Sequence, residues 1–261
     1  MNIRRCRLTL LILGLALLGT VAWAEDQGRE FHWSGKLAPD QLVQVKNVNG
    51  NIDAEAGSGD QVEVTAEKSG PDADQVKIQV VTGGDGVVIC AIYPGSSGSC
   101  SPSWHVNHVR GNDTKVHFTI HLPKNLRFAG QNINGDVNAN GMGRLVRGET
   151  VNGSVRVSTS AWAEAETVNG SIKAKMGNAA WHGTLTLKSV NGSIQVELPD
   201  DLSADVSFKS VNGRISSDFP LTISGGFVGH SAQGRIGNGG RELSVETVNG
   251  SVELKKSSGG I

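Results

Sequence analysis

The amino-acid sequence predicts an all-β protein, most simply a β-solenoid in which one chain forms a stack of short strands. Three observations support this prediction. An Asn-Gly pair between apolar residues recurs along the chain, apolar and polar residues alternate on both sides of it, and 35 glycines are spread among short apolar runs. Alternation with a period of two is typical of half-buried strands, whereas no window after the first 24 residues has helical periodicity.

The repeated unit is an apolar residue, Asn-Gly, a variable residue, and then Ile or Val. Seven copies carry the marker pair: Asn49-Gly50, Asn134-Gly135, Asn152-Gly153, Asn169-Gly170, Asn191-Gly192, Asn212-Gly213 and Asn249-Gly250. A degenerate copy, Ala232-Gln233-Gly234-Arg235-Ile236, is expected to form one more unit. Successive copies are 16 to 22 residues apart, except for a first step of 85, which predicts unmarked units between Asn49 and Asn134.

Each marker pair is predicted to be a sharp corner, because Gly and Asn tolerate positive φ better than other residues. In a solenoid, each unit is one coil and equivalent corners stack about 4.8 Å apart. In the alternative, an antiparallel β-meander, each pair is a type I′ hairpin turn and the asparagines lie two strand spacings apart. We favour the solenoid, because stacked asparagines can hydrogen-bond down a column as a structural turn ladder.

The first 24 residues are predicted to be a signal peptide, so that the mature chain begins at Glu25. Arg4, Arg5 and Arg7 precede an apolar run over 8–21 that is short for a membrane span, and Ala22-Trp23-Ala24 has the small-x-small pattern of a cleavage site. An uncleaved anchor is the alternative. The predicted location is the periplasm, the cell envelope or the exterior.

The mature chain is expected to comprise an N-terminal β region over 25–125, a repeat solenoid over 126–256 that is continuous with it, and a flexible tail over 257–261. Lys255 and Lys256 lie just before this tail. Because lysines hinder pairing between exposed strands, they are expected to protect the last open edge of the stack.

Cys90 and Cys100 are the two cysteines outside the predicted signal peptide. They are ten residues apart and flank a Gly- and Ser-rich segment. In an oxidising compartment this spacing predicts a disulfide that closes a loop. A metal site or a redox dithiol would require a closer pair or further ligands.

Net charge argues against nucleic-acid binding. Without the three arginines of the predicted signal peptide, 21 Lys and Arg stand against 25 Asp and Glu, a formal net charge of −4. No second apolar stretch has the length of a membrane span. The expected partner is an unknown protein or glycan of the envelope or of another surface.

The repeats resemble those of the secreted adhesin-like proteins of unknown function, whose members repeat a T-V-N-G-S-I element in β-solenoid-like domains. The resemblance is carried by residues 150–155, 167–172, 189–194, 210–215 and 247–252, and by the passage Leu122-Pro123-Lys124-Asn125-Leu126. It covers roughly residues 40–255. It implies a β-solenoid fold and, as an expectation, an adhesive or other binding role.

Histidines provide the strongest candidates for metal binding. His117 and His121 share one face of a predicted strand and are about 13 Å apart, which is too far for one metal ion. A site would require His105 and His108 to fold over one of them, so exposed polar positions are the preferred interpretation. No metal and no cofactor are predicted.

The sequence contains no evident catalytic set. A nucleophile elbow and a phosphate-binding Gly loop are missing, and the acidic residues are scattered. Trp104, Trp162 and Trp181 would suit sugar stacking if they were exposed, but buried plugs are the preferred interpretation. We therefore expect a non-catalytic, exported scaffold or binding module. The alternatives are a periplasmic sensor or assembly accessory, and a carbohydrate-active β-helix enzyme.

Overall fold

The computed structural model describes residues 23–96, 99–103, 113–223 and 231–257. The predicted signal peptide lies almost entirely outside these residues, as do Trp104, His105 and His108. Apart from the single 3-10 turn η1 (Ala73–Gln75), the described elements are strands. They are β1 (Trp23–Gln27), β2 (Glu30–Gly35), β3 (Leu42–Lys46), β4 (Ile52–Gly57), β5 (Val62–Ser69), β6 (Lys77–Gly83), β7 (Gly86–Ile92), β8 (Lys115–Pro123), β9 (Arg127–Gln131), β10 (Val137–Met142), β11 (Val146–Asn152), β12 (Val155–Thr159), β13 (Ala163–Asn169), β14 (Ile172–Met176), β15 (Thr184–Asn191), β16 (Ile194–Leu198), β17 (Ala204–Asn212), β18 (Ile215–Ser217), β19 (Thr222–Ile223), β20 (Ser231–Ile236), β21 (Arg241–Asn249) and β22 (Val252–Lys256).

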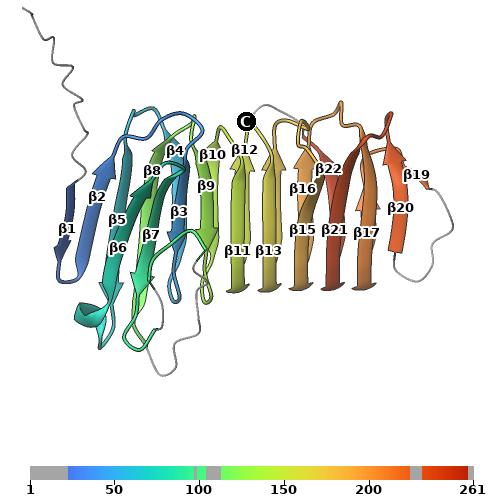
Figure 1. Ribbon diagram of the computed structural model, residues 1–261. Coiled ribbons are helices and arrows are strands. Elements are labelled where there is room, and N and C mark those ends of the chain that lie inside the picture. Colours follow the sequence, from blue (N-terminus) through green and yellow to red (C-terminus); the bar gives the residue numbers. More distant parts are fainter. Residues whose placement is uncertain (1–22, 97–98, 104–112, 224–230, 258–261) are drawn as a thin grey trace, which may run out of the picture.

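The strands form two long sheets (Figure 1). Sheet A has the order β1-β2-β5-β8-β4-β10-β12-β14-β16-β22-β18, and sheet B has the order β19-β20-β17-β21-β15-β13-β11-β9-β3-β7-β6. In the repeat region each coil contributes one strand to each sheet and turns between them at its Asn-Gly pair. The chain is thus an all-β, β-solenoid-like protein, as the sequence predicts.

The core lies between the two sheets. Along β12, Val155 and Val157 are buried while Arg156 is exposed, and β14 and β16 alternate in the same way. One apolar cluster runs from Phe31 near one end to Phe219 near the other. Burial of apolar area on this scale is the main stabilising contribution to folding.

Neighbouring coils pair in parallel and in register, with one irregularity between Ala139 and Met142 of β10. Val137 pairs with Val155, Val155 with Ile172 and Ile172 with Ile194, so that equivalent positions of the repeat stack on each other. The marker asparagines are likewise direct neighbours. This arrangement confirms the solenoid and rules out a meander over the repeats, since hairpins would pair antiparallel.

The order of the coils in space differs from their order in sequence. The last coil, β21 and β22, lies between the coil of β15 and β16 and the coil of β17 and β18. Lys255 and Lys256 are therefore not on the last strand of sheet A, contrary to expectation, since β22 lies between β16 and β18 and pairs with β18 through 252–254. Among the described residues, the strands at this end of the sheets are β18 and β19.

Two further expectations about the repeats need correction. The degenerate copy at 232–236 is not a corner; it lies within β20, a straight strand antiparallel to β17. The long step between Asn49 and Asn134 does not insert coils between these two markers, because their coils pair directly. The intervening strands β5 to β8 extend both sheets on the other side of β3 and β4. They include one unmarked parallel coil, β7 and β8, and the antiparallel strands β5 and β6.

Candidate functional site

The corner where each coil passes from sheet B to sheet A is the most regular surface of the molecule. Here six of the seven marker asparagines donate a side-chain amide N–H to the side-chain oxygen of the asparagine in the adjacent coil, and Asn49 only accepts in this column. The six bonds are 2.7 to 2.8 Å long and join the markers in the order Asn49, Asn134, Asn152, Asn169, Asn191, Asn249 and Asn212. We call this column the asparagine ladder.

The marker glycines allow the backbones of adjacent coils to approach closely. A Cβ added to Gly170 would lie less than 3.0 Å from the carbonyl oxygen of Gly153, and Gly192 has the same relation to Gly170. Positive φ, which the sequence analysis gave as the reason for the Asn-Gly pair, occurs among the markers only at Gly50 and Gly135. The pair is therefore selected by packing and side-chain bonding between coils rather than by a left-handed turn.

The residues on either side of the pair complete the corner. Two residues before the asparagine, a buried hydroxyl donates to the glycine carbonyl of the adjacent coil, as Thr167 does to Gly153 at 2.8 Å. After the glycine, a serine oxygen accepts a backbone N–H, as Ser171 does from Ser193 at 3.3 Å. Each polar position of the T-V-N-G-S element thus bonds to a neighbouring coil, which explains why the element recurs as a block.

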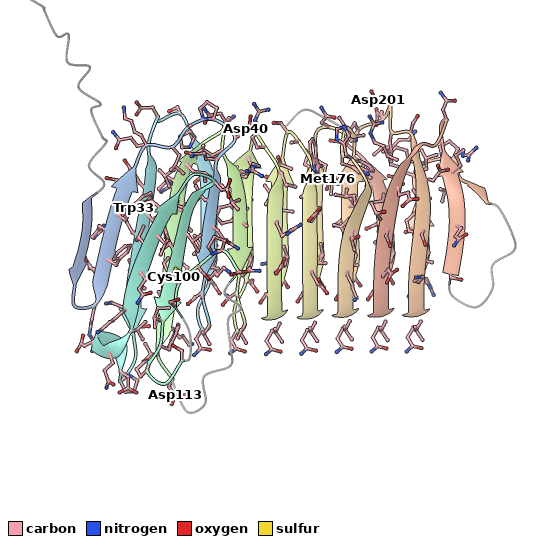
Figure 2. The ribbon with its side chains drawn as sticks, in the orientation of Figure 1. Trp33, Asp40, Cys100, Asp113, Met176 and Asp201 are labelled. Carbon is pink, nitrogen blue, oxygen red and sulfur yellow. A yellow bond between two sulfur atoms is a disulfide. The ribbon has the colours of Figure 1, made fainter. Side chains whose placement is uncertain are left out.

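In the last five copies the valine of the element is the exception, because its side chain lies on the outer face; Val190 is half-buried there, whereas Val48 of the first copy is buried. We define the valine row as Val151, Val168, Val190, Val248 and Val211, which stack along the edge of sheet B. Val168 is 38% exposed, Val151 39%, Val248 40% and Val211 56%. In Figure 2, the evenly spaced side chains just beyond the ends of β11, β13, β15, β21 and β17 carry nitrogen and mark the corner of the asparagine ladder, where these strands end; the valines lie one residue before it. Sequence reasoning counted these valines only as the apolar residue of the repeat. Val151 and Val168 lie two residues after Glu149 and Glu166. Because residues two apart on a strand share a face, this spacing would have predicted that the valines lie on the outer face with these charged residues.

Ion pairs between coils cover the outer face of sheet B beside the valine row. Lys209 pairs with Glu246 at 2.8 Å, and Arg147 pairs with Glu164. The hydrogen bond from Lys209 lowers the pKa of Glu246, and the bond to Glu164 raises the pKa of Arg147. These pairs are partly exposed, so that each contributes little to stability. They leave the valine row as an apolar strip beside a charge-balanced surface.

A shallow groove of about 440 Å³ lies on the same face near β17, β20 and β21, and it contains three carboxylates. Asp205 accepts from Arg235 at 2.8 Å, Glu246 accepts from Lys209 at 2.8 Å, and Glu242 accepts from Thr184 at 2.5 Å. The hydrogen bond from Arg235 is the main cause that lowers the pKa of Asp205. A glycosidase requires one carboxyl group with a raised pKa, and the pKa values of Asp205 and Glu246 are shifted in the opposite direction.

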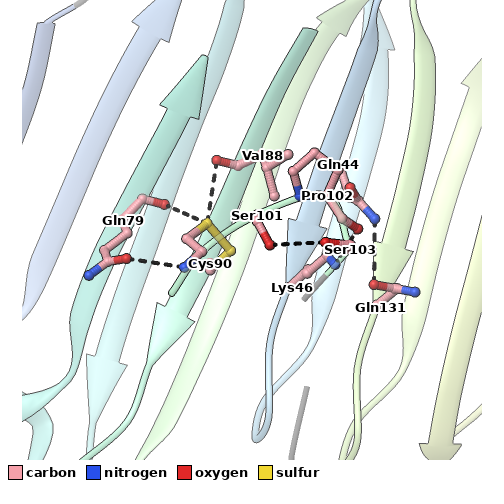
Figure 3. The surroundings of a disulfide bond; sticks show 10 residues. Gln44, Lys46, Gln79, Val88, Cys90, Ser101, Pro102, Ser103 and Gln131 are labelled. Carbon is pink, nitrogen blue, oxygen red and sulfur yellow. Dashed lines mark hydrogen bonds between the residues drawn. A yellow bond between two sulfur atoms is a disulfide. The ribbon is translucent and has the colours of Figure 1, made fainter. Parts of the chain in front are cut away.

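The disulfide joins Cys90 of β7 to Cys100, with their Cα atoms 5.7 Å apart, as the spacing predicts (Figure 3). It holds the segment after β7 against the outer face of sheet B, where the N–H of Cys100 donates to the side chain of Gln79 at 3.4 Å. Below this segment, Lys46 is 1% exposed and donates to the carbonyl of Pro102 at 2.9 Å. Burial lowers the pKa of this lysine, while Glu149 acts in the opposite direction.

Replacing both Cys90 and Cys100 with serine should lower the free energy of unfolding by about 2 to 3 kcal/mol, because the unfolded chain gains the entropy of an open loop. Urea unfolding of the oxidised protein and the variant measures this difference. Reductant should lower the midpoint of the wild-type protein and leave that of the variant unchanged. Equal midpoints for the two oxidised proteins would contradict the expected contribution.

The candidate metal ligands remain apart in the described part of the chain. His117 and His121 both lie on the outer face of β8, and the Nε2 of His117 is 3.1 Å from a carboxylate oxygen of Asp53. Within the described ranges, no group of three or more His, Cys, Asp or Glu side chains is placed to hold a metal ion. His105 and His108 lie outside these residues.

Two of the three candidate tryptophans can be placed. Trp181 is 2% exposed and its Nε1 donates to the carbonyl of Glu242 at 2.9 Å, so it is a buried plug. Trp162 is partly buried against the core, and Trp104 lies outside the described residues. Trp181 therefore provides no open face for a sugar ring, and Trp162 is only partly exposed.

In-register coils, a hydrogen-bonded corner and one continuous core define a repeat protein of the β-solenoid type. No helix among the described residues is long and apolar enough to span a membrane. A family model, Toastrack DUF4097, matches residues 43–255. The chain belongs to this family, which confirms the resemblance seen in the sequence.

Solved structures align with most of this chain at low sequence identity. A candidate cell adhesion protein from Clostridium sporogenes matches with a TM-score of 0.50 at 9% identity, over 87% of this chain and 99% of that chain. A candidate adhesin from Bacteroides fragilis matches with a TM-score of 0.40 at 14% identity, over 87% and 98%. A search of curated proteins finds no match. At these identities the likeness concerns the fold alone.

Proposed function

We propose that this chain is an exported, non-catalytic binding module of the cell envelope, and that the valine row is its contact surface for another protein. One observation carries the proposal. Of the five large apolar side chains that are exposed among the described residues, four belong to this single row: Val151, Val168, Val211 and Val248. Exposed apolar residues scattered singly are ordinary, whereas a contiguous row marks an interaction site.

The solenoid makes this row rigid. The asparagine ladder and the buried hydroxyls fix the backbone immediately beside each valine. A partner would therefore meet side chains already held about 4.8 Å apart, and little conformational entropy would be lost on binding. This repeat favours an elongated partner surface over a small ligand.

The chemistry of the row favours a protein partner over a glycan. Sugar rings are usually bound by exposed aromatic faces, and the row consists of branched aliphatic side chains. The adjoining ion pairs, such as Lys209 with Glu246, are mutually neutralised and provide a polar rim. An apolar strip with a polar rim is the usual composition of a protein interface.

Replacing Val151, Val168 and Val248 together with threonine tests the contact surface, because threonine keeps the β-branched shape and removes the apolar contact. Partners retained by the mature chain from envelope fractions should be lost at least about ten-fold, the equivalent of ~1.4 kcal/mol. The control variant Lys173→Gln with Lys175→Gln changes the outer face of sheet A and should retain the same partners. Equal retention by both variants, with unchanged circular dichroism, would refute the valine row as the contact surface.

Export is tested by the N-terminus of the protein recovered from the envelope or the medium. Cleavage after Ala24 gives Glu25 as the first residue, which leaves 25–27 of β1 paired with β2. Recovery of the full-length N-terminus from the membrane would instead support an anchor. This outcome would overturn the predicted signal peptide and leave the valine row untouched.

A further inference from the structure

The two ends of the asparagine ladder are built differently. At the first end, the side-chain amide of Asn49 donates to the carbonyl of Thr114 at 3.3 Å, and Tyr93 donates to the carbonyl of Asn49 at 2.9 Å. Burial raises the pKa of this tyrosine, so it stays protonated and able to donate. At the last end, Asn212 donates to Asn249 at 2.7 Å, and no described group donates to the side-chain oxygen of Asn212. The ladder is closed at Asn49 and open at Asn212.

The backbone nitrogens that follow the asparagines divide in the same way. Each inner marker glycine donates its N–H to the asparagine carbonyl of the adjacent coil at 2.9 to 3.0 Å, and these donors are Gly50, Gly135, Gly153, Gly170, Gly192 and Gly250. Gly213 belongs to the outermost coil, where no further marker follows. Within the described ranges, its N–H has no acceptor.

This difference matters because an Asn-Gly pair contains the groups for its own deamidation. The glycine nitrogen loses its proton and attacks Cγ of the asparagine, and ammonia leaves as a five-membered imide closes. Water then opens the imide at either carbonyl and gives aspartate or isoaspartate. Before it can attack, a glycine nitrogen whose N–H is hydrogen-bonded to the next coil must break that bond. The asparagine side-chain amide must also break its hydrogen bond in the ladder.

We propose that Asn212 is a site of spontaneous deamidation and that the other six ladder asparagines are protected by the stack. Solvent exposure does not explain this contrast, because Asn152, Asn169, Asn191 and Asn249 are exposed as Asn212 is. The distinguishing feature is the hydrogen bonding of the glycine nitrogen. The Asn140-Gly141 and Asn238-Gly239 pairs lie outside the ladder, and their glycine nitrogens also donate, at 2.8 and 3.1 Å.

The product would alter the end of the solenoid. A carboxylate at position 212 cannot donate to Asn249, and it places negative charge against the oxygen that now accepts this bond. The terminal coil of β17 and β18 would lose its ladder bond. The chemistry is thus expected to loosen this coil first, independently of any partner at the valine row.

The test is incubation of the folded, purified chain at pH 8 and 37 °C, followed by peptide mapping by mass spectrometry. Asn212 should deamidate at least about ten-fold faster than Asn169, Asn191 and Asn249, which corresponds to ~1.4 kcal/mol of opening free energy at the protected sites. In concentrated urea the four rates should converge to within a few-fold, because the local sequences are alike. Similar rates for all four in the folded chain, or protection of Asn212, would overturn the proposal.

A second measurement concerns the consequence. The variant Asn212→Asp reproduces one product, and hydrogen exchange at 215–217 should become at least a few-fold faster in this variant than in the wild-type chain. The same substitution at the closed end of the ladder, Asn49→Asp, is the matched control and should leave exchange at 215–217 unchanged. Unchanged exchange in Asn212→Asp would refute the loosening of the terminal coil.

Discussion

Replacing Gly170 with alanine is expected to prevent the chain from folding, or to lower its free energy of unfolding by more than about 4 kcal/mol. The added Cβ would fall on the carbonyl oxygen of Gly153, which already accepts from the hydroxyl of Thr167. Relieving the overlap requires the two backbones to separate, and this breaks the bond between the N–H of Gly153 and the carbonyl of Asn169. Soluble yield, circular dichroism and urea unfolding measure the effect.

Two companion variants identify the cause. Gly59→Ala adds the same methyl group where no atom lies within 4 Å, and it should change stability by no more than about 0.5 kcal/mol. Gly170→Asn is a second test of close packing, because asparagine also adds a Cβ, and φ at Gly170 is not in the left-handed region that asparagine tolerates. Close packing predicts that Gly170→Asn is as damaging as Gly170→Ala. A well-folded Gly170→Asn chain would contradict close packing as the reason for glycine at this position.

The regular part of the fold could be predicted because its side chains interact with their own copies. A residue such as Asn169 stacks between Asn152 and Asn191, so that repetition in the sequence implies repetition in space. Alternation then assigns the inward and outward sides, for example Val155 inward and Arg156 outward. Cys90 and Cys100 were predictable from their spacing alone.

The order of the coils could not be predicted, and the reason is the same repetition. The unit of Asn212 and the unit of Asn249 could each stack on the corner of Asn191, because both have a hydroxyl residue, Val, Asn and Gly in the same positions. In the structure Asn249 occupies this place and Asn212 lies beyond it. Interactions outside the repeat, such as the pairing of β20 with β17, distinguish the two units.

One pair of residues that resembles the Asn-Gly marker was wrongly predicted to form a corner, because its surroundings differ from those of the markers. Gln233 and Gly234 imitate an Asn-Gly pair, yet they lie in a straight strand opposite Ser207 and Val206 of β17. Nearby, Arg235 pairs with Asp205 across the two strands. The valine row was overlooked for a related reason, since its valines were counted only as the apolar residue of the repeat.

Replacing Trp181 with alanine should lower the free energy of unfolding by about 3 to 5 kcal/mol, the range found for large buried aromatic residues. Its ring packs into the core from the segment between β14 and β15. Its Nε1 also donates to the carbonyl of Glu242 in β21, and so binds this segment to the coil inserted from the C-terminus. Truncation leaves a cavity and an unpaired carbonyl at a point where the order of the coils departs from their order in sequence.

The contributions of packing and hydrogen bonding can be separated by further variants. Trp181→Phe retains most of the apolar volume and loses only the Nε1 bond, for which about 1 kcal/mol is expected, apart from the smaller ring. Trp162→Ala removes a tryptophan that is only partly buried and should cost less than half as much as Trp181→Ala. Thermal unfolding should show a midpoint lowered by roughly 6 to 20 °C for Trp181→Ala, since each kcal/mol shifts the midpoint of a chain of this size by roughly 2 to 4 °C. If Trp181→Ala and Trp162→Ala had the same thermal unfolding midpoint, Trp181 would contribute no more to stability than the partly buried Trp162. The inserted coil would then have to be held by its strand pairing alone.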